Sequence, residues 1–495
     1  MFTPSPYHER IFDFFDRDTR NGVIAAVAGS GKTTLLMELL KRVPAGKRVL
    51  VAAFSADIAK EIERRVKAEN AIRARATCTT LHGLGYRNLR FAFNTRYDER
   101  KLDRVFQLES IARAARLLGG DRASSDRAKR DLRRVVSLLK ATLIETDATS
   151  VRQMIEARGI EFDFVESGWL LHLLPDILEA CVQMTAYCDY DDMPWMPVVK
   201  EMPLEQFDLI LCDEAQDLNA VQMQLVLKSL APGGRVFAVG DPRQAIYGFR
   251  GADTQAMTHL RGLLQAVTLP LSITYRCPVS HVALAKKIAP EIEARPGAPL
   301  GIAREIGDDR LLGEVQSGDM VIGRVNAPLV SLALSLIARG HKAMVRGRDV
   351  GASLKGLLKT AGGASVDETI TRLKRLEQVE LSKLEDRGAS PLQIQATGDK
   401  FETMRAILMR CGTMSDASRV TEQIAQEAGG GVIFSTLHRA KGLEAERVFF
   451  LYPEDIPHPM AKRKDEIEQE MNALYVGLTR SKRELVLVRR KEKDE

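Results

Sequence analysis

The sequence is poor in cysteine, and its cysteines are not grouped. No CxxC pair occurs, and no histidine stands at a spacing from a cysteine that would suit zinc. We therefore expect reduced, mostly buried thiols rather than disulfides or a cysteine-based metal site. The six cysteines are Cys78, Cys181, Cys188, Cys212, Cys277 and Cys411.

Long apolar runs are also missing. No stretch of about 18 uninterrupted apolar residues occurs, which argues against a membrane-spanning helix. The first twenty residues carry charges where a signal peptide needs its apolar stretch, so we expect a cytoplasmic protein. At 495 residues, with 45% apolar and 28% charged residues, the chain is expected to form two to four globular domains.

A strong excess of one charge is absent. The net charge of +6 is compatible with a nucleic-acid partner but is too mild to indicate one. One basic stretch stands out at 121–134, where Arg127, Arg130 and Arg134 are spaced to form one face of a helix. Charge alone favours a solvated helix face, and contact with duplex DNA is the alternative.

What the sequence does contain is an alternation of short apolar runs and helical patterns. This alternation predicts an α/β fold with parallel sheets covered by helices. After the first two apolar runs, helices are predicted over LLMELLKRV at 35–43 and over about 56–68. The predicted strands are 22–28, 48–54, 208–215, 235–241, 320–325, 343–347, 431–438, 447–453 and 484–489.

Two strand-poor segments interrupt this pattern and suggest the domain organisation. Residues 1–90 and 200–275 are expected to form the first α/β domain, and 90–200 its helical insertion. Residues 276–350 and 429–495 are expected to form the second α/β domain, and 351–428 its smaller helical insertion.

The string AVAGSGKT at 26–33, between a predicted strand and a predicted helix, is typical of a phosphate-binding loop. Its small residues let several backbone N–H groups point at a polyphosphate, and the following helix adds its positive end. Lys32 would neutralise the β- and γ-phosphates, and the hydroxyl of Thr33 would hold Mg²⁺. The small residues of this loop are Ala28, Gly29, Ser30 and Gly31.

A carboxylate pair complements this loop. Asp213 ends the apolar run LILC, so it would lie at the carboxyl edge of the sheet and reach Mg²⁺. Glu214 beside it is the natural base for an attacking water. The full string DEAQD at 213–217 also argues against a P-loop kinase, which would not need it.

Six motifs occur in the order found in one helicase family. AVAGSGKTT, DEAQD, VGDPRQAIYGFRGA, LSITYRCP, TLHRAKGLEAERVFF and ALYVGLTRSKREL closely resemble motifs of the UvrD/Rep type of superfamily 1 DNA helicases. The resemblance is dense over 20–90, 205–280 and 430–488 and weak in the two helical insertions.

The resemblance implies two RecA-like domains, each interrupted by a helical insertion, with ATP and Mg²⁺ bound in the cleft between them. It also implies ATP-driven 3′-to-5′ movement on single-stranded DNA, unwinding at single-strand/duplex junctions, and a nucleoid-associated location. It leaves room for a loading protein of unidentified kind. The alternatives are a DNA-stimulated ATPase that strips proteins from DNA with little unwinding, and a non-catalytic binding module.

For the nucleotide, the resemblance implies that Gln244 senses the γ-phosphate and that Arg276 and Arg480 are arginine fingers. A planar, permanently charged guanidinium suits the charge that develops on a transferred phosphoryl group. Tyr275 would stack on adenine and Glu444 would bond the ribose.

Two positions depart from the family pattern. His8 stands where family members usually have an adenine-reading glutamine, and Thr34 stands where they often have arginine. Both changes concern recognition of the base rather than of the phosphates, so use of other nucleotides becomes plausible.

For DNA, the resemblance implies that Tyr247 and Phe249 form a base-stacking platform with Arg250 beside it. Stacking is worth about 1–3 kcal/mol per base and tolerates any sequence. The other strand contacts that it implies are Phe54, Ser55, Thr80, His82, Thr436 and His438.

The acidic string CDYDDM at 188–193 leaves two interpretations open. Asp189, Asp191 and Asp192 could serve a metal-dependent nuclease, or they could lie in a loop that leads from the insertion back to the core. The sequence around them shows no supporting second carboxylate or lysine cluster, which favours the loop.

Overall fold

The computed structural model describes residues 3–118, 126–157, 162, 167–246, 255–339, 341–346, 348–386, 391–425, 431–459 and 461–491. The chain forms two compact units. Unit 1 comprises Met1–Ala26 and Gly31–Ser272, and unit 2 comprises Val27–Ser30 and Ile273–Glu495. In the described parts of both units, no helix is long and apolar enough to cross a membrane.

Unit 1 is built on a six-stranded sheet in the order β3-β2-β6-β7-β1-β8. All neighbouring strands are parallel, so their carboxyl ends meet at one edge of the sheet. The strands are β1 (Gly22–Ala26), β2 (Arg48–Ala53), β3 (Arg75–Thr80), β6 (Phe207–Cys212), β7 (Leu230–Gly240) and β8 (Val267–Leu271).

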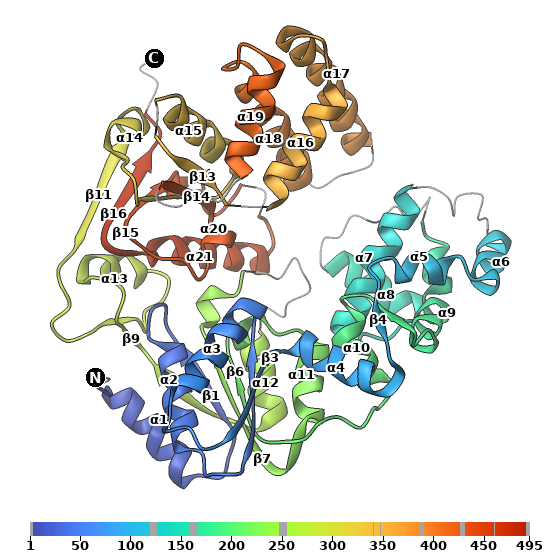
Figure 1. The fold of residues 1–495 in the computed structure, drawn as a ribbon, viewed down its shortest axis with the longest axis vertical. Coiled ribbons are helices and arrows are strands. Elements are labelled where there is room, and N and C mark those ends of the chain that lie inside the picture. Colours follow the sequence, from blue (N-terminus) through green and yellow to red (C-terminus); the bar gives the residue numbers. More distant parts are fainter. Residues whose placement is uncertain are drawn as a thin grey trace. The chain divides into compact units, whose positions relative to one another are not determined.

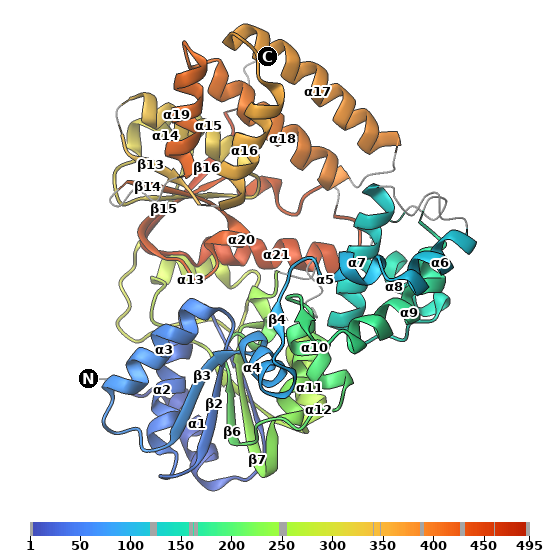
Figure 2. The same cartoon turned by 45° about the vertical axis from the view of Figure 1, so that its right-hand side comes forward.

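Helices cover both faces of this sheet because alternate strand residues bury on opposite sides. On one face, Ile24 and Leu211 pack with α1 (Pro6–Arg17), α2 (Lys32–Arg42) and α3 (Ala56–Ala68). On the other, Val23 and Ile210 pack with a second group of helices (Figure 2). That group is α4 (Leu81–Phe93), α10 (Asp192–Val199), α11 (Ala220–Lys228) and α12 (Ala256–Leu264).

In the segment between α4 and α10, the described residues form helices and two short paired strands (Figure 1). Its apolar side chains join the same core as α4 and α11, so the insertion is not a separate hydrophobic body. Its elements are β4 (Arg96–Tyr97), α5 (Lys101–Phe106), α6 (Glu109–Leu117), α7 (Asp126–Thr142), α8 (Ala148–Ala157), α9 (Leu170–Gln183) and β5 (Tyr187–Cys188).

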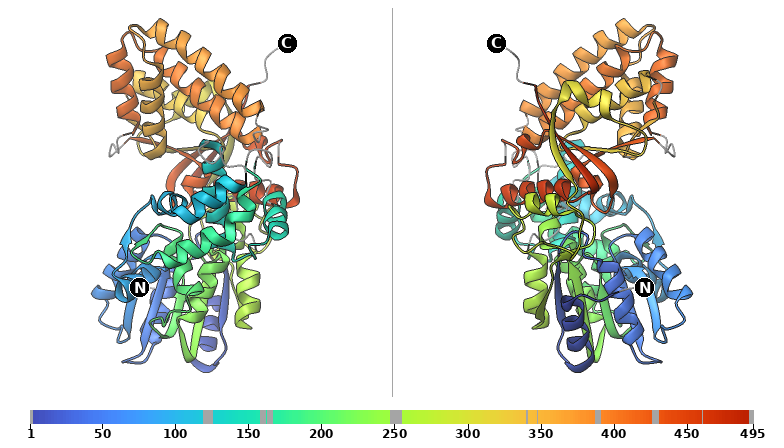
Figure 3. Two further views of the ribbon diagram at one scale, coloured as in Figure 1. Left: turned by 90° about the vertical axis from the view of Figure 1, so that its right-hand side faces the viewer. Right: turned by 90° about the vertical axis from the view of Figure 1, so that its left-hand side faces the viewer.

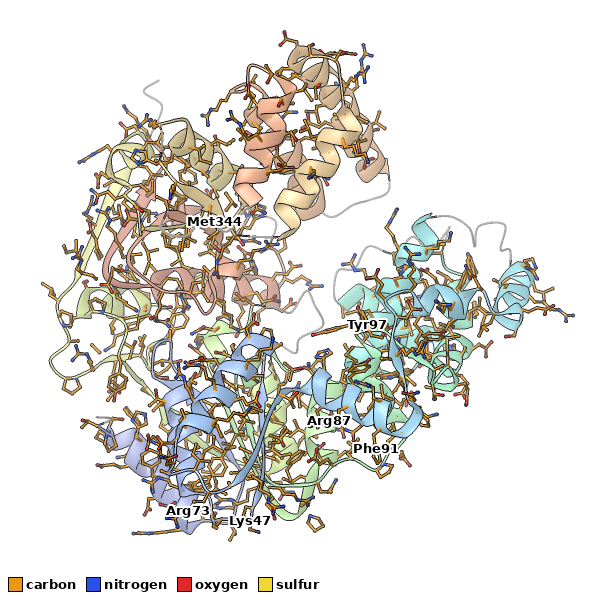
Figure 4. All side chains as sticks on the ribbon, viewed as in Figure 1. Lys47, Arg73, Arg87, Phe91, Tyr97 and Met344 are labelled. Atoms are coloured by element: carbon orange, nitrogen blue, oxygen red, sulfur yellow. The ribbon has the colours of Figure 1, made fainter. Side chains whose placement is uncertain are left out.

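The described part of the basic stretch, from Asp126 on, lies in α7, as the spacing predicted. Arg130 and Arg134 lie one turn apart and are exposed. The side chain of Arg127 lies outside the described residues. Exposed side chains also mark α4, where Figure 4 labels Arg87 and Phe91 one turn apart, Phe91 being 95% exposed.

Unit 2 has a second six-stranded parallel sheet, in the order β11-β16-β15-β12-β14-β13. A separate short pair, β9 (Ile273–Thr274) and β10 (Glu293–Ala294), precedes it. The six strands are β11 (Ile302–Gly307), β12 (Met320–Gly323), β13 (Ala343–Val345), β14 (Val432–Thr436), β15 (Ala445–Leu451) and β16 (Ser481–Arg489).

The helices of unit 2 fall into two sets. One set follows the strands: α13 (Val279–Ala285), α14 (Asp308–Glu314), α15 (Asn326–Ala338), α20 (Leu437–Ala440) and α21 (Lys464–Leu478). The other forms a helical group at one end of the sheet, drawn in orange tones in Figure 3. It consists of α16 (Arg348–Ala361), α17 (Val366–Asp386), α18 (Pro391–Leu408) and α19 (Met414–Ala425).

The predicted fold class is confirmed: the chain is α/β with two parallel sheets, each accompanied by a helical segment. All nine predicted strands overlap observed ones, and the helix predicted over about 56–68 is α3. Three strands of these sheets were missed. They are β3, β8 and β11, and each lies at the edge of its sheet.

Candidate functional site

Strand order brings the nucleotide-binding motifs of unit 1 together. β6, β7 and β1 are neighbours in the sheet, although β1 is separated from the other two by a long stretch of sequence. Asp213 and Glu214 follow β6, the 3₁₀ turn Pro242–Gln244 follows β7, and α2 begins at Lys32 after β1. Their side chains therefore gather at one carboxyl edge, where ligands bind in open α/β sheets.

The loop between β1 and α2 has a backbone that only glycine adopts easily. Gly29 and Gly31 have φ values of +73° and +84°, in the left-handed region. A Cβ on Gly29 would also lie 2.6 Å from the Cβ of Arg276, so the space excludes any side chain. Gly31 offers α2 no side-chain cap, and this leaves the N–H groups of the first helical turn available to a phosphate.

Lys32 lies within ion-pair distance of the predicted base. Its Nζ is 3.2 Å from Oε1 of Glu214, and both side chains are largely buried. Burial alone would lower the pKa of Lys32, but the carboxylates of Glu214, Asp241 and Asp213 raise it above its ordinary value. The lysine is therefore a fixed cation at the position where a polyphosphate would carry its charge.

Glu214 has a strained backbone. Its φ of 50° and ψ of 44° place a non-glycine residue in the left-handed region, which costs of order 1–2 kcal/mol. Its N–H donates to Oδ1 of Asp213 over 3.0 Å, and the N–H of Asp213 donates to the carbonyl of Ala52 on β2 over 2.9 Å. These bonds fix the two carboxylates relative to the sheet.

Gln216, in the short helix η2 (Ala215–Asp217), received no separate role in the sequence analysis. Its Nε2 donates to Oε2 of Glu214 over 2.5 Å, and its Oε1 accepts from the N–H of Asp241 over 2.9 Å. A Cβ on Gly240 would lie 2.5 Å from that Oε1, so this glycine makes room for the amide. Only its place in the string DEAQD could have signalled this role.

The network continues to the predicted γ-phosphate sensor. Nε2 of Gln244 donates to Oδ2 of Asp241 over 2.7 Å, and Gln244 is buried. Burial raises the pKa of Asp241 to about 6, while Lys32 and the bond from Gln244 act in the opposite direction. A continuous series of polar contacts thus joins Lys32 to Gln244 through Glu214, Gln216 and Asp241.

In unit 2, Arg276 is held by an ion pair and a backbone contact. Its Nε lies 2.8 Å from Oε2 of Glu444, and its Nη1 donates to the carbonyl of Thr479 over 3.3 Å. Lys482 pairs with the other oxygen of Glu444. Burial would raise the pKa of Glu444, but Lys482 and Arg276 lower it below its ordinary value. Both oxygens of the predicted ribose ligand are thus engaged in ion pairs.

Arg480 is only 1% exposed and is held largely by main-chain oxygens. Its Nε donates to the carbonyl of Val476 over 2.9 Å and its Nη1 to that of Leu443 over 3.2 Å. Its Nη2 donates to Oγ1 of Thr479 over 3.2 Å. Tyr275, the predicted adenine-stacking residue, is 42% exposed.

The two positions that depart from the family pattern lie in unit 1. His8 is buried, and its Nδ1 accepts from the N–H of Ser5 over 3.2 Å and contacts the Ser5 hydroxyl at 2.8 Å. Burial lowers the pKa of His8, and Glu38 opposes this. The ring is thus bound into the N-cap of α1. Thr34 is half-buried in the first turn of α2.

The DNA contacts predicted for unit 1 follow two neighbouring strands. Phe54, 46% exposed, comes after β2, and Thr80, at the end of β3, caps α4 by accepting from the N–H of Gly83 over 3.0 Å. The ring of His82 stacks on that of Tyr190, with centroids 4.0 Å apart and planes at 19°. Burial lowers the pKa of His82 to about 4.

Tyr190 was missed as a candidate. Its side chain is 56% exposed although one face of the ring covers His82. The sequence analysis considered only the aspartates of the surrounding string CDYDDM as candidate site residues, and nothing local to it indicated a histidine partner from a distant motif.

In unit 2, Thr436 ends β14 and His438 lies in α20, directly after it. Thr436 is buried and His438 is half-buried. Arg439 Nη1 donates to the carbonyl of Arg346, which follows β13, over 3.2 Å. The predicted base-stacking platform, Tyr247, Phe249 and Arg250, lies outside the described residues.

Residues 189–191 of the acidic string form a turn between β5 and α10, as the loop interpretation expected, and α10 begins at Asp192. Two buried lysines from distant helices neutralise its carboxylates. Lys101 on α5 lies 2.8 Å from one oxygen of Asp192, and Lys140 on α7 lies 2.8 Å from the other and 3.0 Å from Asp189. Burial raises the pKa of Asp191. Among the described residues, no group of three potential metal ligands occurs here or elsewhere.

This cluster therefore joins helices rather than presenting carboxylates to a metal. Burial raises the pKa of Asp192, but Lys140 and Lys101 outweigh it and hold that pKa below its ordinary value. The nuclease interpretation loses its chemical basis, because Asp189 and Asp192, two of the three aspartates that it needed, are already paired with ammonium groups.

Comparison with known proteins agrees with this geometry. The UvrD/REP helicase N-terminal domain family matches residues 15–264, and the UvrD-like helicase C-terminal domain family matches residues 368–492. ATP-dependent DNA helicase UvrD2 of Mycobacterium tuberculosis is 25% identical over 536 residues, covering 94% of this chain and 76% of the relative.

Two further relatives are more distant. F-box DNA helicase protein 1 of Schizosaccharomyces pombe is 21% identical, covering 94% of this chain and 55% of the relative. DNA helicase II of Haemophilus influenzae is 24% identical, covering 58% of this chain and 41% of the relative. The two domain matches, together with the motifs gathered at the sheet edge, show that the chain belongs to the UvrD/Rep type of superfamily 1, a family of ATP-dependent DNA helicases.

Proposed function

We propose that this protein hydrolyses ATP to move 3′ to 5′ along single-stranded DNA and to unwind duplex at single-strand/duplex junctions. The observation that carries the proposal is the polar network of unit 1. A fixed cation, Lys32, lies 3.2 Å from the carboxylate of Glu214, and Gln216 and Asp241 connect that carboxylate to Gln244. Such a network ties a phosphate-binding cation to a base and to a γ-phosphate sensor.

In this proposal Glu214 accepts a proton from the attacking water, and Lys32 neutralises charge on the β- and γ-phosphates. The residues at the sheet edge also fit Mg²⁺. Asp213 and Thr33 supply hard oxygen donors, and Mg²⁺ commonly takes one or two protein ligands with phosphate oxygens and waters completing the shell. Mg²⁺ would supply charge neutralisation on the phosphates when it is bound.

Arg276 and Arg480 are proposed to stabilise the charge that develops on the transferred phosphoryl group. In the described structure Arg276 pairs with Glu444, and Arg480 is bound to main-chain carbonyls. Each would have to exchange these partners for phosphate oxygens, so we propose that nucleotide binding rearranges both side chains. Base selectivity would be weak, because the ring of His8 is bonded to Ser5.

DNA is proposed to follow the ends of β2 and β3 in unit 1 and of β14 in unit 2. Phe54 and Tyr190 present exposed aromatic surface for base stacking, and His438 with Arg439 offers polar contacts. Exposed Arg130 and Arg134 on α7 are proposed to contact the duplex phosphates. Replacing both by glutamate should weaken junction binding and reduce its salt dependence, whereas an unchanged salt slope would contradict this contact.

The test of the proposed function is unwinding of partial duplexes with a single-stranded tail at either end. We expect ATP-dependent unwinding of the 3′-tailed duplex and little of the 5′-tailed one. Lys32→Ala is the control that should abolish both ATP hydrolysis and unwinding while leaving DNA binding intact. Unwinding from the 5′ tail alone would refute the polarity, and DNA-stimulated hydrolysis without unwinding would favour the stripping of proteins from DNA.

A further inference from the structure

A buried tyrosine in unit 2 holds the backbone of the nucleotide-binding loop. The hydroxyl of Tyr475, on α21, accepts a hydrogen bond of 3.0 Å from the N–H of Ala28. Tyr475 has no exposed surface, and it packs with Ala28 and with Cys277, Val282 and Ala285. The sequence analysis gave this residue no role, although it lies within the motif ALYVGLTRSKREL.

The loop is held at further points beside this bond. The N–H of Tyr275 donates to the carbonyl of Gly29 over 2.8 Å, and the N–H of Ser30 donates to the carbonyl of Val27 over 3.2 Å. Val27–Ser30 belong to unit 2, whereas the strand that precedes them belongs to unit 1. Of these bonds, the one at Ala28 is made by a side chain, so a substitution can remove it without altering the backbone.

The same tyrosine is linked to a predicted arginine finger. The carbonyl of Tyr475 accepts from Oγ1 of Thr479 over 2.8 Å, and that Oγ1 accepts from Nη2 of Arg480 over 3.2 Å. One turn of α21 therefore connects the N–H of Ala28 to the guanidinium of Arg480. Arg276 reaches the same turn through the carbonyl of Thr479.

We propose that Tyr475 is a positioning residue for ATP binding: its hydroxyl holds the loop at Ala28 in the conformation that receives the phosphates. The inference rests on the proposed function of the loop. A buried N–H without a partner is unfavourable, so loss of the hydroxyl would let the loop leave this conformation. Nucleotide would then have to reorder the loop on binding, and this lowers affinity without altering the chemical step.

The test is Tyr475→Phe, which keeps the ring and removes the hydroxyl. We expect the Kd for a fluorescent ATP analogue with Mg²⁺, and the KM for ATP, to rise about five- to thirty-fold, corresponding to about 1–2 kcal/mol. The kcat at saturating ATP and single-stranded DNA should stay within about twofold of the wild-type value. A merely structural role would instead lower the melting temperature and leave the Kd unchanged.

Tyr452→Phe is the matched control. Its hydroxyl donates to Oδ2 of Asp308 over 3.1 Å, in the same unit but outside the loop, so its removal should not change the Kd. An unchanged Kd for Tyr475→Phe, or an equal rise for Tyr452→Phe, would overturn the proposal. If the wild-type protein itself did not bind ATP, that result would refute the proposed function and would not be a test of the role of Tyr475.

Thr479 supplies a second test if Tyr475→Phe does not fold. Thr479→Val removes the hydroxyl that joins Tyr475 to Arg480, whereas Thr479→Ser keeps it. We expect Thr479→Val to lower kcat about tenfold with little change in KM, and Thr479→Ser to behave like the wild type. Equal kinetics for the two variants would contradict the linked arrangement.

Discussion

Replacing Asp192 by asparagine is expected to destabilise the helical insertion of unit 1 severely. Asp192 has no exposed surface, and its two oxygens each lie 2.8 Å from a buried ammonium group, those of Lys101 and Lys140. Lys140 also lies 3.0 Å from Asp189. The wild-type cluster therefore contains two positive and two negative charges, and the substitution leaves two positive charges facing one negative charge.

The size of the effect follows from this imbalance. Removing one partner of a buried ion pair leaves an uncompensated buried charge, which costs about 3–5 kcal/mol. With a urea dependence of about 1–3 kcal/mol per molar, the unfolding midpoint should fall by roughly 1–5 M. Because the lysines hold the pKa of Asp192 below its ordinary value, the wild-type contribution is present above the ordinary carboxyl range. It is lost as the pH falls through that lowered pKa.

The chain provides a selective probe for this experiment. Its two tryptophans, Trp169 and Trp195, both belong to the segment between β4 and β6. Trp195 is 5% exposed, and Nζ of Lys140 lies 5.3 Å from its ring centroid. Tryptophan fluorescence during urea titration therefore reports on the insertion itself.

An exposed ion pair in the same insertion supplies the control. Asp103 on α5 pairs with Arg133 on α7, and both side chains are well exposed. Asp103→Asn should cost less than about 1 kcal/mol. The double variant Asp192→Asn with Lys140→Met should be less destabilised than the sum of the single variants, because it removes one charge of each sign. A midpoint for Asp192→Asn equal to that of the Asp103 control would refute the reasoning.

Two further substitutions and one titration test the site. Glu214→Gln should lower kcat for ATP hydrolysis about 100-fold or more and leave nucleotide affinity within about threefold, measured by steady-state kinetics and analogue binding; unchanged kcat would exclude it as the base. Gln216→Leu should lower kcat at least about tenfold by freeing Glu214 and Asp241, and wild-type kinetics would show that their contact is dispensable. Because burial lowers the pKa of His82 to about 4, its NMR signal should stay flat from about pH 5 to about pH 8, whereas a midpoint near 6.5 would contradict its burial under Tyr190.

The fold could be predicted where strands are buried on both sides. β1, β2, β6 and β7 have a neighbouring strand on each side and are apolar runs, so their sequences alone predict buried strands. The missed strands β3, β8 and β11 lie at sheet edges, where one neighbour and greater exposure permit polar residues. β3 reads RATCTT, and β8 contains Pro270, which is tolerated mainly at an edge. Their pairing depends on tertiary contacts, and the local periodicity of apolar residues gives no information about such contacts.

The candidate site could be predicted where chemistry dictates the residue type. Lys32, Asp213 and Glu214 are recognisable because phosphate, Mg²⁺ and water each require a particular group at a particular strand end. Gln216 and Tyr475 are different, because each contacts groups of the loop or the carboxylates and is proposed to hold them in place. Any residue able to satisfy the same donors and acceptors could serve, so only the structure shows which one does.

The buried ion-pair cluster of Asp189 and Asp192 with Lys101 and Lys140 is a second case in which the sequence did not reveal the tertiary partners. Its aspartates were visible in the sequence, but Lys101 and Lys140 come from helices 91 and 52 residues before Asp192 in the chain. In the sequence alone, the carboxylates resembled metal ligands. In the structure, the lysines neutralise these carboxylates, and the ion pairs join α5 and α7 to α10. Since α10 begins two residues after Tyr190, we expect the same ion pairs to help set where Tyr190 meets His82. Weakening the cluster should therefore reduce the affinity for DNA as well as the stability of the fold. A variant of the cluster that lowers the stability but leaves the affinity for DNA unchanged would show that other contacts hold the stacking of Tyr190 on His82.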